Sequence, residues 1–368
     1  MHLLKANKGF PINMDDTVLH TRQGHSYIIP DHLATSFQNT PSEMCTLTPF
    51  ENEKELKEKT DYTGKRLLIN RTGGIGDFFF ICRTVHEIKK QYKNVFAEFT
   101  CAPRYQNAIT SLLMPHIIDK SNTILIPYPS YEMCDYFFTF EGFLEDTREA
   151  SRVNAFDLVG RDKFFMNVGM DHTTPVNIPP VADEQAQELL KGITQPMVGI
   201  QVKATAILRT YPTHQLLDLM HLLIEKGYKV VLIDKKPNIE ALIQGGLRKE
   251  GLLDKVILPY SDTIAGSLEV SAALIKHCHL LIAPDSSLVY IGDSLGTPTI
   301  SLYGPVSSYL RAKGLNVYAI EAKGGCYNCY RHGSSGCPWS NDGWSCCLKK
   351  IRPDTIFNLS VDIIDGKK

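Results

Sequence analysis

An aspartate closes a glycine-rich turn in the stretch NRTGGIGDFFF, residues 70–80. Three glycines in four positions let the backbone approach a ligand closely, and the helix that follows presents free N–H groups. Neither nucleotide-binding fingerprint fits, because Phe79 stands where GxGxxG needs its last glycine and no GKS/T ending follows. Asp77 is therefore interpreted either as a cap of the following helix or as a general base for an attacking hydroxyl.

A second stretch, APDSSLVYIGDSLGTPTISLYGP at residues 283–305, joins a strand end to a serine pair. The predicted strand ends at Asp285, and Ser286 and Ser287 open a short helix. The free amides at this helix start form a site for an anion such as a diphosphate. In the simpler interpretation, Asp285 and Ser286 only cap the helix.

A third stretch, QVKATAILRTYP at residues 201–212, follows a predicted strand and carries Lys203, Thr205 and Arg209. On a loop at the carboxyl edge of a sheet, a guanidinium can bind phosphate oxygens through two parallel hydrogen bonds. A solvated surface arginine is the ordinary alternative. The loop position favours a role in binding.

These stretches need elements that position them, and the chain offers two runs of alternating strands and helices. The first contains KRLLINR, FFFICRTVHEIKKQY, VFAEFTC, RYQNAITSLLM and TILIPYP, and the second begins at MVGIQV. Such alternation predicts parallel sheets covered by helices. We expect a small irregular N-terminal extension over residues 1–60, a Rossmann-like domain over 61–180, and a second Rossmann-like domain over 181–368. Ligands would bind in a cleft lined by the carboxyl ends of both sheets.

The pieces GGIGD, KAT…RTYP and above all LIAPDSSLVYIGDSLGTPTISLYGP make residues 65 to about 365 resemble the lipopolysaccharide heptosyltransferases of glycosyltransferase family 9. This resemblance implies a GT-B fold, in which two doubly wound Rossmann-like domains face each other across a cleft. It also implies that a sugar is transferred from a nucleoside diphosphate donor with inversion at the anomeric carbon.

The resemblance also implies roles for individual residues. The family's general base falls on Asp77, and its phosphate-binding lysine falls on Arg209, with Thr205 as the neighbouring hydroxyl donor. Residues 285–287 match the positions that contact the donor's sugar and diphosphate. Tyr290 stands where family members usually carry histidine, a departure that concerns the donor sugar more than the reaction type. The donor-binding candidates are Gly74, Gly76, Lys203, Thr205, Arg209, Asp285, Ser286, Ser287 and Tyr290.

Five of the ten cysteines gather in residues 326–347. They are Cys326, Cys329, Cys337, Cys346 and Cys347. A CxxC pair followed by further cysteines in a Gly/Ser-rich loop has the spacing of a structural zinc or iron site, with His332 as a further candidate ligand. Free thiols or a disulfide are the alternatives. The resemblance extends to autotransporter heptosyltransferases with an iron site, whereas the sugar transfer itself requires no cofactor.

The net charge and the apolar runs of the sequence limit which kinds of partner the protein is expected to bind. With 39 basic and 40 acidic side chains among 368 residues, nothing in the bulk charge favours binding to nucleic acid or an anionic membrane. No apolar run approaches the roughly 20 residues of a membrane span. We expect a cytoplasmic glycosyltransferase with a glycan or protein acceptor and ADP-heptose as a candidate donor. Three other hypotheses stay open: transfer to hydroxylated DNA bases, a nucleotide-sugar epimerase of the same fold, and a non-catalytic sugar-nucleotide-binding protein.

Overall fold

A computed structural model of the chain describes residues 1–14, 17–38, 40–113, 116–143, 148–169, 171–322, 329 and 336–368. The chain divides into two compact units. Unit 1 comprises Met1–Ala150 and Ala155–Gly169, and unit 2 comprises Ser151–Asn154 and Met170–Lys368. None of the helices in the described ranges is long and apolar enough to span a membrane.

The N-terminal segment of unit 1 is an antiparallel sheet, so the irregular extension expected for residues 1–60 is wrong. Its elements are β1 (His2–Ala6), β2 (Pro11–Met14), β3 (Thr17–His20), β4 (Ser26–Ile29), α1 (Asp31–Ala34) and β5 (Cys45–Pro49). Strands β5, β1 and β4 pair antiparallel, and β2 pairs with β3. Leu4, Ile29 and Phe37 contribute to a separate core for this sheet. The strands are too short to show a sustained alternation in sequence.

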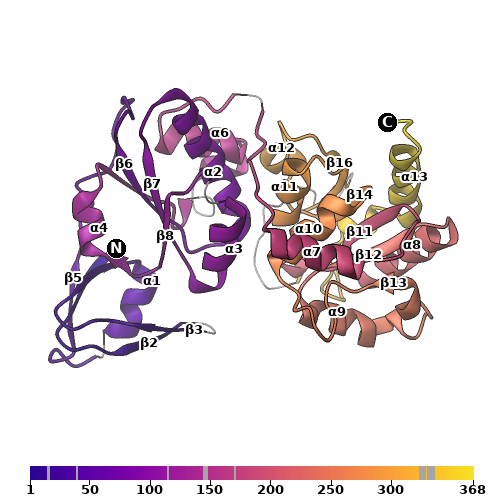
Figure 1. Ribbon diagram of the computed structural model, residues 1–368, viewed down its shortest axis with the longest axis horizontal. Helices are drawn as coiled ribbons and strands as arrows, with labels where there is room; N and C mark the ends of the chain where they lie inside the picture. Colours follow the sequence, from indigo (N-terminus) through magenta and orange to yellow (C-terminus); the bar gives the residue numbers. More distant parts are fainter. Residues whose placement is uncertain are drawn as a thin grey trace. The chain divides into compact units, whose positions relative to one another are not determined.

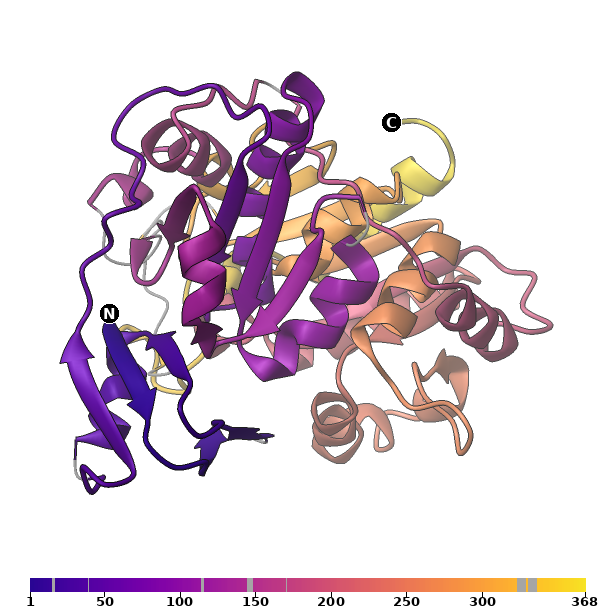
Figure 2. The same cartoon turned by 60° about the vertical axis from the view of Figure 1, so that its left-hand side comes forward.

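The rest of unit 1 is a Rossmann-like half with parallel strands (Figure 1). Its elements are β6 (Arg66–Asn70), α2 (Ile75–Gln91), β7 (Phe96–Cys101), α3 (Pro103–Leu113), β8 (Lys120–Thr123), β9 (Ile126–Pro127), α4 (Tyr128–Met133), β10 (Tyr136–Thr139) and α6 (Ala155–Lys163). The parallel order is β10–β6–β7–β8. The stretch TILIPYP is not one strand, because β9 pairs antiparallel with β4 and joins the N-terminal sheet (Figure 2).

Unit 2 contains a six-stranded parallel sheet. Its elements are α7 (Pro180–Leu189), β11 (Met197–Gln201), α8 (Thr213–Glu225), β12 (Lys229–Ile233), α9 (Lys236–Leu242), β13 (Val256–Ile257), α10 (Leu268–His277), β14 (Leu280–Pro284), α11 (Ser287–Ser294), β15 (Thr299–Tyr303), α12 (Ser308–Arg311), β16 (Tyr318–Glu321) and α13 (Pro353–Ile364). The order β13–β12–β11–β14–β15–β16 is the doubly wound order 3-2-1-4-5-6. The direction of winding therefore changes between β11 and β14.

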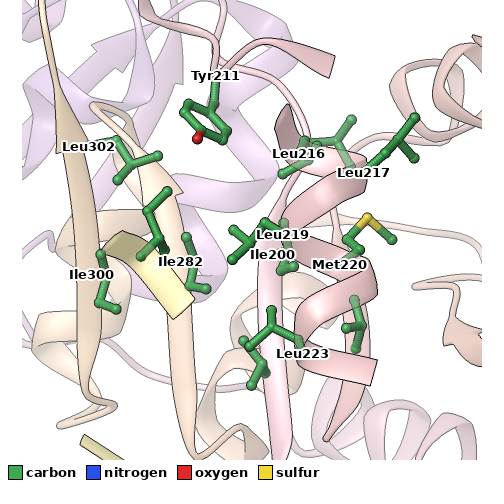
Figure 3. Packing of buried hydrophobic residues seen from close by; sticks show 14 of the residues in the cluster. Ile200, Tyr211, Leu216, Leu217, Leu219, Met220, Leu223, Ile282, Ile300 and Leu302 are labelled. Carbon is green, nitrogen blue, oxygen red and sulfur yellow. The ribbon is translucent and has the colours of Figure 1, made fainter. Parts of the chain in front are cut away.

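Helix α8 shows how the apolar pattern holds these strands in place. Its buried residues recur at helical spacing and form one face. They are Leu216, Leu217, Leu219, Met220 and Leu223. Figure 3 shows this face packed against strand residues that include Ile200 and Ile282. Burial on this scale contributes about 1.5–3 kcal/mol for each large apolar side chain. The packing fixes the ends of β11 and β14, and hence the loops that follow them.

Candidate functional site

Unit 1 has a change of winding direction between β6 and β10, and polar side chains gather there. In an open α/β sheet, ligands bind at the carboxyl ends of the strands where the winding direction changes. The loop after β6 carries Arg71 and Thr72, and the chain after β10 carries Phe140 and Glu141. The first turn of α2, with Asp77, begins directly after the β6 loop.

Arg71 forms a nearly buried ion pair with Asp77. Nη2 of Arg71 lies 2.5 Å from Oδ2 of Asp77, and Nε donates to the same oxygen over 3.2 Å. The arginine side chain is 2% exposed and the aspartate side chain 21%. Nη1 of Arg71 donates to the carbonyl of Phe140 at 2.7 Å, which joins the two loops at the winding change. The sequence reasoning missed Arg71, although its charge at the start of the glycine turn was a signal.

Asp77 does not cap helix α2. The helix begins at Ile75, its N-cap is Gly74, and no side chain caps it. Asp77 lies in the first turn, where a negative charge interacts favourably with the helix dipole. Both hydrogen bonds from Arg71 reach Oδ2, and Oδ1 accepts none from the described residues. One carboxylate oxygen is thus left without a hydrogen-bond donor among the described residues.

Gly73 and Glu141 shape the same loop. A side chain at Gly73 would collide with the guanidinium of Arg71, so a close approach, not a positive φ, requires glycine there. Glu141 accepts from the backbone N–H of Thr72 at 2.6 Å and from the Thr72 hydroxyl at 2.5 Å. This second carboxylate was also missed by sequence reasoning. Its hydrogen bonds hold the loop, whereas those of Asp77 leave an oxygen open.

In unit 2, Arg209 and Asp285 meet at the winding change between β11 and β14. Arg209 ends a short 3₁₀ helix, Ile207–Arg209, in the loop after β11. Its Nη1 donates to the backbone carbonyl of Asp285 at 3.2 Å and lies 3.6 Å from the carboxylate Oδ2. The two separate sequence stretches that carry these residues are therefore brought together, with Arg209 about one-fifth exposed.

The serine pair opens α11 as the sequence predicted. Ser286 is the N-cap, and its hydroxyl accepts from the N–H of Leu288 at 3.3 Å. The same hydroxyl donates to Oε1 of Gln201, the last residue of β11, at 2.5 Å. This hydroxyl therefore fixes the helix start to the neighbouring strand. The half-buried Ser287 follows as the first helical residue.

Unpartnered polar atoms concentrate at this end of the sheet. Of seven buried side-chain polar atoms without a hydrogen-bond partner in the described part of the chain, four belong to Arg209, Asp285 and β15, the strand next to β14. They are Arg209 Nε, Asp285 Oδ2, Ser301 Oγ and Tyr303 Oη. Burial and the nearby Asp285 charge both raise the pKa of Tyr303. An unpaired buried polar group costs about 1–3 kcal/mol, so such a concentration is typical of a site completed by a ligand or water.

The other donor candidates differ in exposure. Lys203 and Thr205 are exposed on the loop before Arg209. The backbone N–H of Lys203 donates to Asp234 at 2.7 Å, and burial raises the pKa of this aspartate. Tyr290, in contrast, is only 4% exposed within α11. The structure thus brings Arg209 and residues 285–287 together and leaves Tyr290 within the packed helix.

The cysteine-rich segment is only partly covered by the described residues, because Cys326 and His332 lie outside them. Cys329, Cys337 and Cys347 line one small cavity, whereas Cys346 is not among its walls. Among the described residues, no group of three or more His, Cys, Asp or Glu side chains is arranged to hold a metal ion.

Comparison with known proteins shows a similarity to one family. Residues 161–338 match the sequence profile of glycosyltransferase family 9 (heptosyltransferase). Lipopolysaccharide heptosyltransferase 2 of Escherichia coli strain K12 is 26% identical over 184 residues, or 45% of this chain and 51% of that protein. Over this stretch, which is a little under half of its length, the chain is similar to glycosyltransferase family 9. The Salmonella typhimurium protein of the same name is 25% identical with the same coverage, so the chain spans about half the length of the curated relatives it matches.

Solved structures share the fold of this chain. E. coli ADP-heptose lipopolysaccharide heptosyltransferase II has a TM-score of 0.61 at 14% identity, covering 82% of this chain and 99% of its own. The iron-containing dodecameric glycosyltransferase TibC from enterotoxigenic E. coli has the same TM-score and identity, covering 100% of this chain and 92% of its own. These likenesses confirm the expected GT-B class with two Rossmann-like domains.

Proposed function

We propose that this protein is an inverting glycosyltransferase that moves a sugar from a nucleoside diphosphate donor to a hydroxyl of a glycan or protein. Heptose is the candidate sugar and ADP-heptose the candidate donor, because the E. coli neighbour is an ADP-heptose enzyme. One observation carries the proposal: Arg209 meets the N-terminus of α11 at the winding change of a 3-2-1-4-5-6 sheet. A guanidinium, helix amides and unpartnered polar atoms together suit a leaving diphosphate.

In the proposed reaction, the acceptor oxygen attacks the anomeric carbon while the bond from that carbon to the donor phosphate breaks. The proton of the acceptor hydroxyl passes to Oδ1 of Asp77, the oxygen that Arg71 leaves open. Arg71 holds Asp77 in place through the two hydrogen bonds to Oδ2. Negative charge develops on the departing diphosphate and is stabilised by Arg209 and the amides that start α11. A single displacement inverts the configuration at the anomeric carbon.

The test is a mass-spectrometric screen of ADP-, GDP- and UDP-sugars with and without glycan, protein and hydroxylated-DNA acceptors. We expect one donor to be consumed with formation of a glycosylated glycan or protein. Arg209→Ala should weaken donor binding, while Asp77→Asn should slow transfer with donor binding retained. Epimerised donor without acceptor, salt-sensitive transfer to DNA, or unchanged function in Asp77→Asn would each replace the proposal with another class. Turnover of none of the donors would refute it.

We also propose a structural zinc or iron ion at the cysteine-rich segment. Thiolates are the ligands that soft metals prefer, and three cysteine side chains already surround one cavity. Cys326, the partner of Cys329 in the CxxC pair, and Cys346 are the other candidate ligands. Elemental analysis of protein purified without chelators should find about one metal ion per chain. Metal-free protein with unchanged thermal stability would exclude this role.

A further inference from the structure

Three cysteines of the cysteine-rich segment share a cavity with residues next to the Arg209 loop and the turn after β15. The small cavity lined by Cys329, Cys337 and Cys347 has Leu208 and Pro305 among its other walls. Leu208 immediately precedes Arg209, and Pro305 follows the turn that leaves β15. The thiols therefore share walls with both loops at the proposed diphosphate site.

Cys347 fixes the position of the turn after β15. A β-carbon added at Gly304 would lie 2.7 Å from Sγ of Cys347 and 2.9 Å from Cγ of Leu348. The sulfur thus occupies the space that any side chain at position 304 would need. Cys347 is 2% exposed, and its Sγ lies 2.8 Å from the hydroxyl of Ser345. A packed interior transmits a change in one such group to its neighbours.

The chain just after the cysteines is also attached to the far end of the Arg209 loop. The hydroxyl of Tyr211 donates to the backbone carbonyl of Ile351 at 2.6 Å. Gln215, in the first turn of α8, donates to the carbonyl of Lys349 at 3.1 Å. Arg209 therefore lies between two contacts: Leu208 lines the cavity with the cysteines, and Tyr211 bonds to Ile351 just after the cysteine-rich segment.

We propose that Cys347 is a positioning residue for the donor site: through Gly304 and the shared cavity it holds the loop that aims Arg209 at the donor diphosphate. This inference rests on the proposed function. If the cavity and the Arg209 loop move together, donor binding should also slow the chemical modification of the cavity thiols.

Calorimetry with ADP as the probe tests whether Cys347 positions the donor site. We expect Cys347→Ala to raise the Kd for ADP about 5-fold or more, within the usual range of coupling between sites, and the near-isosteric Cys347→Ser to restore most of the affinity. Gly304→Ala should also weaken binding, and combining it with Cys347→Ala should recover part of the loss, because the alanine removes the clashing sulfur. Cys278→Ala is the matched control. Cys278 is also buried in unit 2, but it lies just before the amino end of β14, whereas the proposed diphosphate site is at the carboxyl end.

Alkylation by iodoacetamide, measured for each cysteine by mass spectrometry, tests whether donor binding protects the cavity thiols. Saturating ADP should slow modification of Cys337 and Cys347 by more than it slows that of Cys278, which reports global unfolding. Variants of Cys347 that lower the Tm but keep the wild-type Kd would show a merely structural role and overturn the inference. If Arg209→Ala abolishes ADP binding and Cys347→Ala leaves the Kd for ADP at its wild-type value, the inference fails and the proposed function stands. If the wild-type protein binds no ADP, UDP or GDP, both fall.

Discussion

Replacing Asp77 by asparagine separates the catalytic role proposed for this residue from its structural role. The change keeps a side-chain oxygen for Arg71 but removes the charge that balances a guanidinium only 2% exposed. Removing one partner of a fully buried ion pair costs about 3–5 kcal/mol. Because Asp77 is one-fifth exposed and asparagine still accepts a hydrogen bond, we expect the free energy of unfolding to fall by about 1–3 kcal/mol. Most molecules of a domain with ordinary stability would remain folded.

The transfer rate should fall much further than the stability. Loss of a positioned general base costs roughly 10²–10⁴-fold in rate. Single-turnover transfer at saturating donor measures this effect, while the Kd for the donor nucleotide should stay unchanged because Arg209 and α11 are intact. Circular dichroism at the assay temperature checks the folded fraction.

Glu87→Gln is the matched control for Asp77→Asn. Glu87 lies on the same helix and pairs with Arg83 at 2.5 Å, with the arginine 4% and the glutamate 16% exposed. It is ten residues beyond Asp77, or about 15 Å along the helix. We expect a similar loss of stability with a normal transfer rate. Equal rate losses in both variants, or transfer by Asp77→Asn within threefold of wild type, would refute the assignment of Asp77 as the base.

Three further predictions concern the fold. Leu223→Ala in the α8 core should lower the free energy of unfolding by about 2–5 kcal/mol in a denaturant titration, and the half-buried Leu222→Ala by less. Gly160→Ala should lower the free energy of unfolding by about 1–3 kcal/mol, because the new β-carbon would lie 2.9 Å from a backbone carbonyl oxygen. Gly245→Ala is the control, since its new β-carbon meets no atom within 4 Å and should not destabilise the protein. Equal losses in the two variants would contradict the packing around α6. Burial raises the pKa of Asp293 above the ordinary value of about 3.9, so its contribution to stability is largest below that value and falls as the pH rises through the raised pKa. At pH values above about 4, the Tm should therefore fall less steeply with rising pH for Asp293→Asn than for wild type. Parallel plots of Tm against pH for the two proteins would contradict a raised pKa of Asp293.

Several features of the site could be predicted from local sequence because they depend on neighbouring residues. The strand ends, the start of α11 at the serine pair and the amphipathic helix α8 follow from short-range rules on capping and apolar periodicity. The N-terminal sheet could not be predicted in this way. Its strands of four or five residues become stable only by pairing, and β9 reaches β4 from almost a hundred residues away along the chain.

The sequence by itself determined which residues can do chemistry: a carboxylate at a glycine turn, a guanidinium on a loop, a serine pair at a helix start and a cluster of thiols. The tertiary structure decided what each of them contacts. It made Asp77, interpreted from sequence as either a helix cap or a general base, the partner of Arg71, joined Arg209 to Asp285, and set Cys347 against Gly304. The physical reason is that strand order is set by which apolar faces pack together over long separations. Strand order in turn decides which loops meet at a winding change, and no local pattern of residues records it.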